Sequence, residues 1–203
     1  VIEGAVTTEE AAETVRAVRK AAGTVIAIGA CALTAGLPGL ASDGVGRYAA
    51  AVYGEAVPGA CATLRDPAPV AAYIPVDYEV PCCPVDPRAF VAVLHRALYG
   101  SNGLTPSSTL CGECKRNERG CFFGQGTLCL GLVTRGGCGA RCPELGRPCN
   151  GCAGLSADAN VGAASAACDE AGIGAARLDE ALELFNKQGL AAGQPGADGS
   201  RAR

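Results

Sequence analysis

The chain has few or none of several residue types and sequence patterns on which whole classes of protein depend. It contains no methionine and no tryptophan, a single histidine, and an aromatic content of only 4%. Its net charge is −3 with 17 lysines and arginines, which argues against nucleic-acid binding, because such proteins contact phosphates through clustered basic residues. No apolar run approaches the roughly 18 uncharged residues that a membrane-spanning helix requires. We therefore expect no nucleic-acid partner and no membrane span.

The sequence patterns of nucleotide-binding and catalytic sites are also missing. The chain has no phosphate-binding loop and no glycine-rich dinucleotide fingerprint, so we expect neither NAD(P) nor flavin to bind it. It shows no constellation of acid, base and nucleophile either, and we expect no catalytic site of its own. The first residue is Val1 rather than methionine, which predicts a fragment or a processed amino terminus.

Cysteine, in contrast, is abundant. The chain has 13 cysteines, and eight of them fall between residues 111 and 152. Their spacing is Cys111-x2-Cys114-x6-Cys121-x7-Cys129, then Cys138-x3-Cys142-Pro-x5-Cys149-x2-Cys152. A Cys-x2-Cys step lets one turn present two thiolates to one metal site, and the many glycines nearby permit the positive φ angles of backbone that wraps a cluster. The segment predicts two 4Fe–4S clusters.

Two other uses of clustered cysteines stay open at this point. A disulfide scaffold suits secreted chains of under about 80 residues, whereas this chain has 203 residues, 49% hydrophobic composition and an odd number of cysteines. Paired structural zinc sites also use Cys-x2-Cys, although zinc ribbons show two such steps per site and each quartet here has one. Dense cysteine without a disulfide pattern favours the reducing cytoplasm.

Outside the cysteine-rich segment the pattern predicts an α/β fold. Residues 7–22 read as a helix with a threonine cap and glutamates in its first turn. Residues 24–30 form an apolar, β-branched run typical of a strand buried on both faces of a parallel sheet. Cys31 follows that strand at its carboxyl end, where open α/β sheets place their ligands.

A second strand, at 77–80, leads into the turn Pro81-Cys82-Cys83-Pro84 and a helix over 86–99. The apolar stripe of that helix consists of Phe90, Val91, Leu94 and Leu98. Shorter helices are expected near 47–53, 160–170 and 178–187, with frayed final residues.

Three cysteines are interpreted as non-ligands. Cys61 and Cys168 fit neither quartet and are interpreted as buried thiols. Cys82 is interpreted as a spare thiol, because adjacent side chains diverge from a common metal.

Three stretches, 28–36, 81–84 and 110–154, resemble the small, electron-transferring subunit of nickel–iron hydrogenases. The resemblance is greatest to the cytosolic sulfhydrogenase or bidirectional NAD(P)-linked type. It implies a flavodoxin-like domain over 1–100, truncated at its amino terminus, and an irregular domain over 101–155 that binds two 4Fe–4S clusters. Residues 156–203 would form a helical carboxyl-terminal extension with a frayed tail.

The same resemblance implies roles for individual cysteines. It assigns Cys31 and Cys83 to a proximal cluster, Cys111, Cys114, Cys121 and Cys129 to a distal cluster, and Cys138, Cys142, Cys149 and Cys152 to a medial cluster. The family's other two proximal ligands lie in a Cys-x2-Cys turn that would precede Val1. Cys82 stands where the family usually has glycine.

Partners follow from the resemblance as well. It implies a hydrogenase complex, an H2:acceptor oxidoreductase, with a nickel–iron large subunit and with flavin/NAD(P)-binding and ferredoxin-like electron-transfer subunits. A related small subunit coupled to deazaflavin or heterodisulfide reduction is one alternative. A zinc-stabilised interaction module without a redox role is the other.

Overall fold

The computed structural model describes residues 1–59, 64–100, 106, 108–116 and 120–191. The chain divides into two compact units, Val1–Ser101 and Asn102–Arg203. The first unit combines helices with a parallel sheet, so the predicted α/β class is confirmed. The second unit carries both cysteine quartets.

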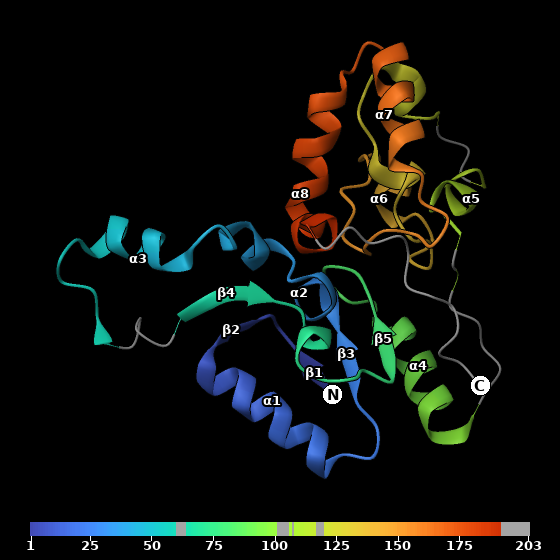
Figure 1. Cartoon of the computed structure of the whole chain (residues 1–203). Coiled ribbons are helices and arrows are strands. Elements are labelled where there is room, and N and C mark those ends of the chain that lie inside the picture. The colour runs from blue at the N-terminus through green and yellow to red at the C-terminus, as the bar shows by residue number, and fades with distance from the viewer. Residues whose placement is uncertain (60–63, 101–105, 107, 117–119, 192–203) are drawn as a thin grey trace. The chain divides into compact units, whose positions relative to one another are not determined.

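A three-stranded parallel sheet with the order β1-β3-β5 forms the centre of the first unit (Figure 1). The strands are β1 (Ile2–Glu3), β3 (Ile26–Ile28) and β5 (Tyr78–Val80). Val25, Ile26 and Ala27 are at most 4% exposed, as expected of a central strand covered on both faces. The predicted strands at 24–30 and 77–80 are therefore confirmed, with shorter bounds.

The first unit also contains a second, antiparallel strand pair and α-helices. They are the antiparallel pair β2 (Val6–Thr8) and β4 (Leu64–Ala68) and the helices α1 (Glu9–Ala21), α2 (Gly29–Thr34), α3 (Val45–Tyr53) and α4 (Pro87–Tyr99). Helix α1 begins as predicted, because the side chain of Thr8 accepts a hydrogen bond from the Ala11 N–H at 3.1 Å. Helix α4 begins after Asp86, whose side chain caps the Arg88 N–H.

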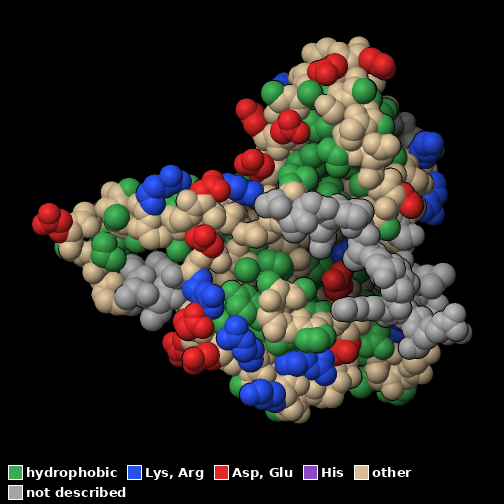
Figure 2. Space-filling view, viewed as in Figure 1, with side chains coloured by type: hydrophobic (Ala, Val, Ile, Leu, Met, Phe, Trp, Pro, Cys, Tyr) green, Lys and Arg blue, Asp and Glu red, His purple; other side chains and the backbone are tan. Residues whose placement is uncertain are grey.

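The apolar stripe of α4 is only partly covered. Phe90 and Leu94 are half-buried, whereas Val91 and Leu98 are 46% and 64% exposed. Periodicity correctly located the apolar side of the helix, but a helix packed against the edge strand β5 is covered on one flank only. Helix α3 also has hydrophobic side chains at the surface (Figure 2), and its Val52 is 74% exposed.

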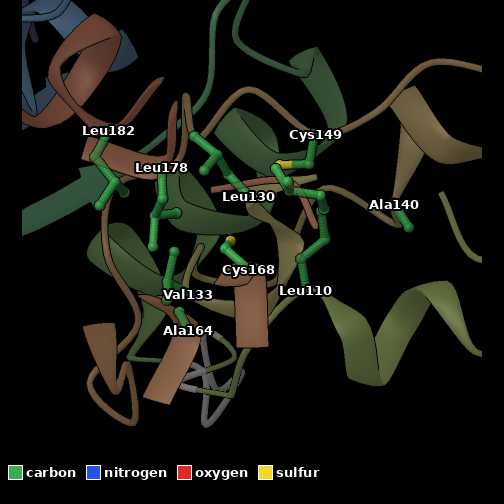
Figure 3. Close-up of a cluster of buried hydrophobic side chains, with 10 residues drawn as sticks. Leu110, Leu130, Val133, Ala140, Cys149, Ala164, Cys168, Leu178 and Leu182 are labelled. Atoms are coloured by element: carbon green, nitrogen blue, oxygen red, sulfur yellow. The ribbon is translucent and has the colours of Figure 1, made fainter. Parts of the chain in front are cut away.

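The second unit packs its cysteine-bearing loops against two carboxyl-terminal helices. Its helices are α5 (Cys111–Cys114), α6 (Arg141–Glu144), α7 (Val161–Glu170) and α8 (Ala175–Ala191). One hydrophobic cluster joins loops and helices, and it consists of Leu110, Leu130, Val133, Ala140, Cys149, Ala164, Cys168, Ile173, Leu178 and Leu182 (Figure 3). Cys168 is fully buried there, as predicted; Cys61 lies outside the described residues. None of the described helices has both the length and the apolar character needed to cross a membrane.

Asp77 ties the end of α1 to the start of β3 in the first unit. One of its carboxylate oxygens accepts a hydrogen bond from the Val25 N–H at 2.7 Å and another from the Arg19 guanidinium. Arg19 also donates to the carbonyls of Ala22 and Gly23, just beyond α1. The Val25 N–H, followed by the Arg19 hydrogen bond, lowers the pKa of Asp77.

Replacing this carboxylate should weaken the fold in a pH-dependent way. We expect Asp77→Asn to lower the free energy of unfolding at pH 7 by about 1 kcal/mol, mainly by weakening the bond to the Val25 N–H, since a partly exposed ion pair contributes little. The folded-state pKa of Asp77 lies below the unfolded value. The stability lost in the variant, here called the deficit, is therefore largest above about pH 4 and becomes smaller as the pH falls further.

Urea unfolding of wild type and variant across this pH range measures the deficit. Glu13→Gln is the matched control, since it removes an exposed charge from α1, and it should change stability little. A deficit of the same size at pH 3 and pH 7 would contradict the assigned role of Asp77.

Candidate metal centres

The four thiols of the first quartet lie near one another, with Cys121 at the surface. Cys111 and Cys114 lie at the two ends of the single turn α5. A Cβ added at Gly131 would lie 3.7 Å from the sulfurs of both Cys111 and Cys129. Burial raises the pKa of Cys111, and the nearby sulfurs of Cys129, Cys114 and Cys121 raise it further. The structure thus brings together the four residues that the sequence grouped.

The second quartet is brought together in the same way. Burial raises the pKa of Cys142, and so do the sulfurs of Cys152 and Cys138. Burial also raises the pKa of Cys149 to about 12 against the opposing effect of the Gly151 N–H, and Cys152 is among the neighbours that raise it. Cys149 is 7% exposed, whereas Cys142 is exposed. This quartet therefore has a buried side and an open side.

Cys129 and Cys149 join the two quartets. The Cys149 N–H donates a hydrogen bond to the Cys129 sulfur at 3.2 Å, and the Leu130 N–H donates to the Cys149 carbonyl at 2.9 Å. The Cys129 sulfur also contributes to the raised pKa of Cys142. The two groups of four thiols therefore lie side by side within the second unit.

Backbone pairing holds the loops that carry these thiols. The Leu110 N–H donates to the Thr134 carbonyl at 2.8 Å, and the Gly136 N–H donates to the Ser108 carbonyl at 2.9 Å. This short antiparallel contact joins the chain entering the first quartet to the chain entering the second. The ligand geometry thus rests on main-chain hydrogen bonds as well as on the cysteines.

The donor set of each quartet suits a metal cluster. A buried thiol stays protonated unless a cation compensates its negative charge, and metal binding supplies that compensation. Among the described residues, no three His, Cys, Asp or Glu side chains are close enough to hold a single metal ion. In a four-iron cluster each thiolate binds a different iron, so the four thiolates need not meet at one ion.

Cys31 and Cys83 lie at one edge of the sheet in the first unit. Cys31 is in α2, directly after β3, and Cys83 follows β5. Since β3 and β5 are neighbouring parallel strands, both cysteines lie beyond the carboxyl ends of their strands, at the same edge of the sheet. The Ala30 N–H donates to the Cys82 carbonyl at 3.1 Å and joins the two segments. Cys83 is exposed, whereas Cys31 and Cys82 are half-buried.

Four residues around these sites have structural roles that the sequence analysis did not assign to them. A Cβ at Gly36 would lie 3.0 Å from the Cys31 sulfur, so this glycine lets the chain fold back over the cysteine. Cys82 has a φ of 88°, in the left-handed region that favours glycine. In the second unit Asn186 of α8 donates to the Gly151 carbonyl at 3.4 Å, and Glu113 accepts two backbone N–H groups from the loop around Cys138.

Comparison with known proteins gives a consistent set of relatives. The model of the family described as "NADH ubiquinone oxidoreductase, 20 Kd subunit" matches residues 1–97. Sulfhydrogenase 2 subunit delta of Pyrococcus furiosus is 37% identical over 161 residues, which is 79% of this chain and 67% of the relative. A subunit of the vhu F420-non-reducing hydrogenase of Methanocaldococcus jannaschii is 30% identical over 217 residues, which is 92% of this chain and 75% of the relative.

One solved structure is also similar. It is the crystal structure of an NAD+-reducing NiFe hydrogenase in the H2-reduced state, with 30% identity and a TM-score of 0.47 over 52% of this chain and 66% of that chain. The chain thus spans about two thirds of the length of that hydrogenase chain and of the Pyrococcus relative.

The fit around Gly151 gives a direct test of the second quartet's packing. Gly151 has a φ of 82°, and an added Cβ would lie 3.0 Å from Leu130 Cδ1 and 3.2 Å from Asn186 Nδ2. We expect Gly151→Ala to lower the free energy of unfolding for two reasons. Backbone strain should contribute about 1–2 kcal/mol, and the crowding of the added methyl group should contribute about 1–3 kcal/mol.

Gly126→Ala is the matched control for this prediction. Gly126 has a φ of 72° and open space around an added Cβ, so its variant should show the backbone strain alone. Chemical denaturation of both variants beside wild type measures the difference. Equal losses would contradict the tight fit at Gly151.

Proposed function

The chain belongs to the family of hydrogenase small subunits related to the NADH ubiquinone oxidoreductase 20 Kd subunit, and on that footing we propose that it is the iron–sulfur electron-transfer subunit of a nickel–iron hydrogenase complex. Its relatives are hydrogenase subunits, so the chain belongs to an oxidoreductase complex. Its task there would be to relay electrons between the H2-activating large subunit and an NAD(P)/flavin module. The pair of adjacent thiol quartets, joined through Cys129 and Cys149, is the observation that supports this most directly.

Each quartet would hold one 4Fe–4S cluster. The first would be bound by Cys111, Cys114, Cys121 and Cys129, and the second by Cys138, Cys142, Cys149 and Cys152. A cluster bound there would accept and pass on one electron at a time. The protein would supply thiolates, water exclusion and hydrogen bonds to sulfur. Leu130 and Val133 beside the quartets are at most 1% exposed, and the Cys149 N–H already points at the Cys129 sulfur.

Cys31 and Cys83 would supply two thiolates of a third, proximal cluster in a flavodoxin-like domain. Their position at the carboxyl edge of neighbouring parallel strands supports this assignment, because α/β sheets bind their ligands at that edge. The same edge would face the large subunit. Cys82 would remain a spare thiol, since its side chain diverges from that of Cys83.

The electron acceptor distinguishes two candidate complexes. The second candidate is a related small subunit coupled to deazaflavin or heterodisulfide reduction, and one relative is a subunit of a hydrogenase named as F420-non-reducing. H2-dependent reduction of NAD(P)+, of a deazaflavin and of a heterodisulfide by the purified complex separates the candidates. Reduction of the heterodisulfide without reduction of NAD(P)+ would favour the second candidate.

Metal content tests the cluster assignment. Two complete quartets should hold about eight iron atoms per chain, because each 4Fe–4S cluster takes four thiolates. Cys111→Ser and Cys152→Ser should each remove about half of that iron. Iron and zinc are measured by elemental analysis of the anaerobically purified protein.

Cys168→Ala is the matched control, since Cys168 is a fully buried cysteine of α7 that belongs to neither quartet. This variant should keep its iron even where it loses stability. Stoichiometric zinc with little iron in the wild type would instead support a zinc-stabilised interaction module.

The surface beside Cys31 tests the proposed partner. Leu37 follows Gly36, which packs on Cys31, and its side chain is 48% exposed. Permanent subunit interfaces bury about 2,000 Å² or more of mainly apolar surface. We therefore expect Leu37→Glu to reduce the amount of large subunit that copurifies with the chain by about tenfold.

Leu98→Glu is the matched control for Leu37→Glu. Leu98 is 64% exposed and lies about 16 Å further along α4 from the first residue of that helix, Pro87. Pro87, at the start of α4, is close to Cys83 in sequence. Leu98 is near the other end of α4 and is therefore distant from the carboxyl edge of the sheet, where Cys83 lies. Equal recovery of the large subunit with Leu37→Glu and with wild type would contradict the proposed interface.

A further inference from the structure

Glu113 connects the two quartets through its side chain. It lies inside the α5 turn that carries Cys111 and Cys114 of the first quartet. One carboxylate oxygen accepts a hydrogen bond from the Gly137 N–H at 2.6 Å, and the other accepts one from the Gly139 N–H at 2.9 Å. These two glycines flank Cys138, the first cysteine of the second quartet. The side chain of Glu113, in a turn of the first quartet, therefore binds the backbone on both sides of Cys138, in the second quartet.

The loop around Cys138 is shaped to receive this carboxylate. A Cβ added at Gly136 would lie 3.2 Å from Glu113 Oε1 and 3.3 Å from the Ser108 carbonyl oxygen. Gly137 and Gly139 have φ angles of 116° and 68°, which ordinary side chains rarely adopt. The close approach at Gly136 and the positive φ angles of the two glycines after it together direct two backbone N–H groups at the Glu113 carboxylate.

The two bonds are stronger than ordinary side-chain contacts. Hydrogen bonds to an ionised acceptor are roughly twice as strong as neutral ones, and two at once also fix an orientation. Glu113 itself is half-buried, and both of its hydrogen bonds to this loop are exposed to solvent. The contact adds to the main-chain pairing of Ser108 with Gly136 close by.

The carboxylate also places a negative charge beside both quartets. A nearby negative charge opposes the addition of an electron, and this effect grows as the surroundings become less polar. Net charge and hydrogen bonding are among the factors that set the reduction potential of an iron–sulfur cluster. The charge of Glu113 would therefore lower the potential at both sites, not at one alone.

We propose that Glu113 is a positioning residue that fixes the Cys138 loop against the Cys111–Cys114 turn and lowers the reduction potentials of both clusters. This inference rests on the proposed function, because it needs clusters in both quartets. Glu113 itself is not a metal ligand in this scheme. It acts through the backbone on either side of Cys138.

The test compares variants of the whole complex, purified anaerobically. Glu113→Gln keeps the size of the side chain but removes its charge and one of its two acceptors. Glu113→Asp keeps the charge on a shorter side chain, and Glu113→Ala removes both acceptors. Glu144→Gln is the matched control, because Glu144 is an exposed glutamate in α6, two residues from Cys142. Iron content, reduction potentials from EPR-monitored titration and the spin–spin interaction between reduced clusters are measured for each.

We expect Glu113→Gln to keep the iron content of the wild-type complex, to raise the potentials of both clusters and to alter their spin–spin interaction. Glu113→Asp should restore the potentials in part, whereas Glu144→Gln should resemble wild type. Glu113→Ala should lose iron chiefly from the second quartet.

Potentials and EPR spectra of Glu113→Gln identical to wild type would overturn the proposal. Shifts of equal size in Glu113→Gln and Glu144→Gln would also overturn it, since any nearby charge would then have the same effect. Wild-type protein without iron would refute the proposed function itself, a result distinct from either of these.

Discussion

The gathering of eight thiols in one small unit, with Cys149 buried and most of the others half-buried, is the constraint on which the second unit depends. Neutral thiols pack well among Leu110, Leu130 and Val133, but thiolates at the same positions need a positive counter-charge. Cys149, with a pKa raised to about 12, is the clearest case. The loops must therefore already be held close together by interactions that do not involve the sulfurs. Main-chain bonds from Leu110 to Thr134 and from Leu130 to Cys149 supply that support.

The two units place their cysteines by different physical means. In the first unit, the register of β3 against β5 brings Cys31 and Cys83 to the same edge, so strand pairing sets their approximate positions. In the second unit, irregular loops are fixed by hydrogen bonds and by packing on α7 and α8, through side chains such as Leu178 and Leu182. A substitution in the first unit's strands would shift whole loops, whereas a single residue such as Gly151 can disturb one ligand turn of the second.

Local patterns in the sequence were enough to predict many elements. Thr8 at the start of α1 and the apolar run containing Ile26 act within a few residues of where they stand, and both predictions are confirmed. Contacts between distant residues could not be found in that way. Glu113 lies 24 residues from Gly137, and Asn186 lies 35 residues from Gly151. The exposure of Leu98 likewise depends on which elements cover α4, and no periodicity within the helix contains that information.

Cys82 shows how the sheet edge maintains an unfavourable backbone conformation. A non-glycine residue in the left-handed region raises the free energy of the folded chain by about 1–2 kcal/mol. Such residues persist only where their surroundings fix them. Here the parallel pairing of β3 with β5 fixes the chain on one side, and the bond from the Ala30 N–H to the Cys82 carbonyl fixes the turn itself. The turn thus combines that bond with a φ of 88° at Cys82. The conformation of the turn would therefore suit glycine at this position, and the backbone around Cys82 serves the shape of the edge whether or not its thiol takes part in a cluster.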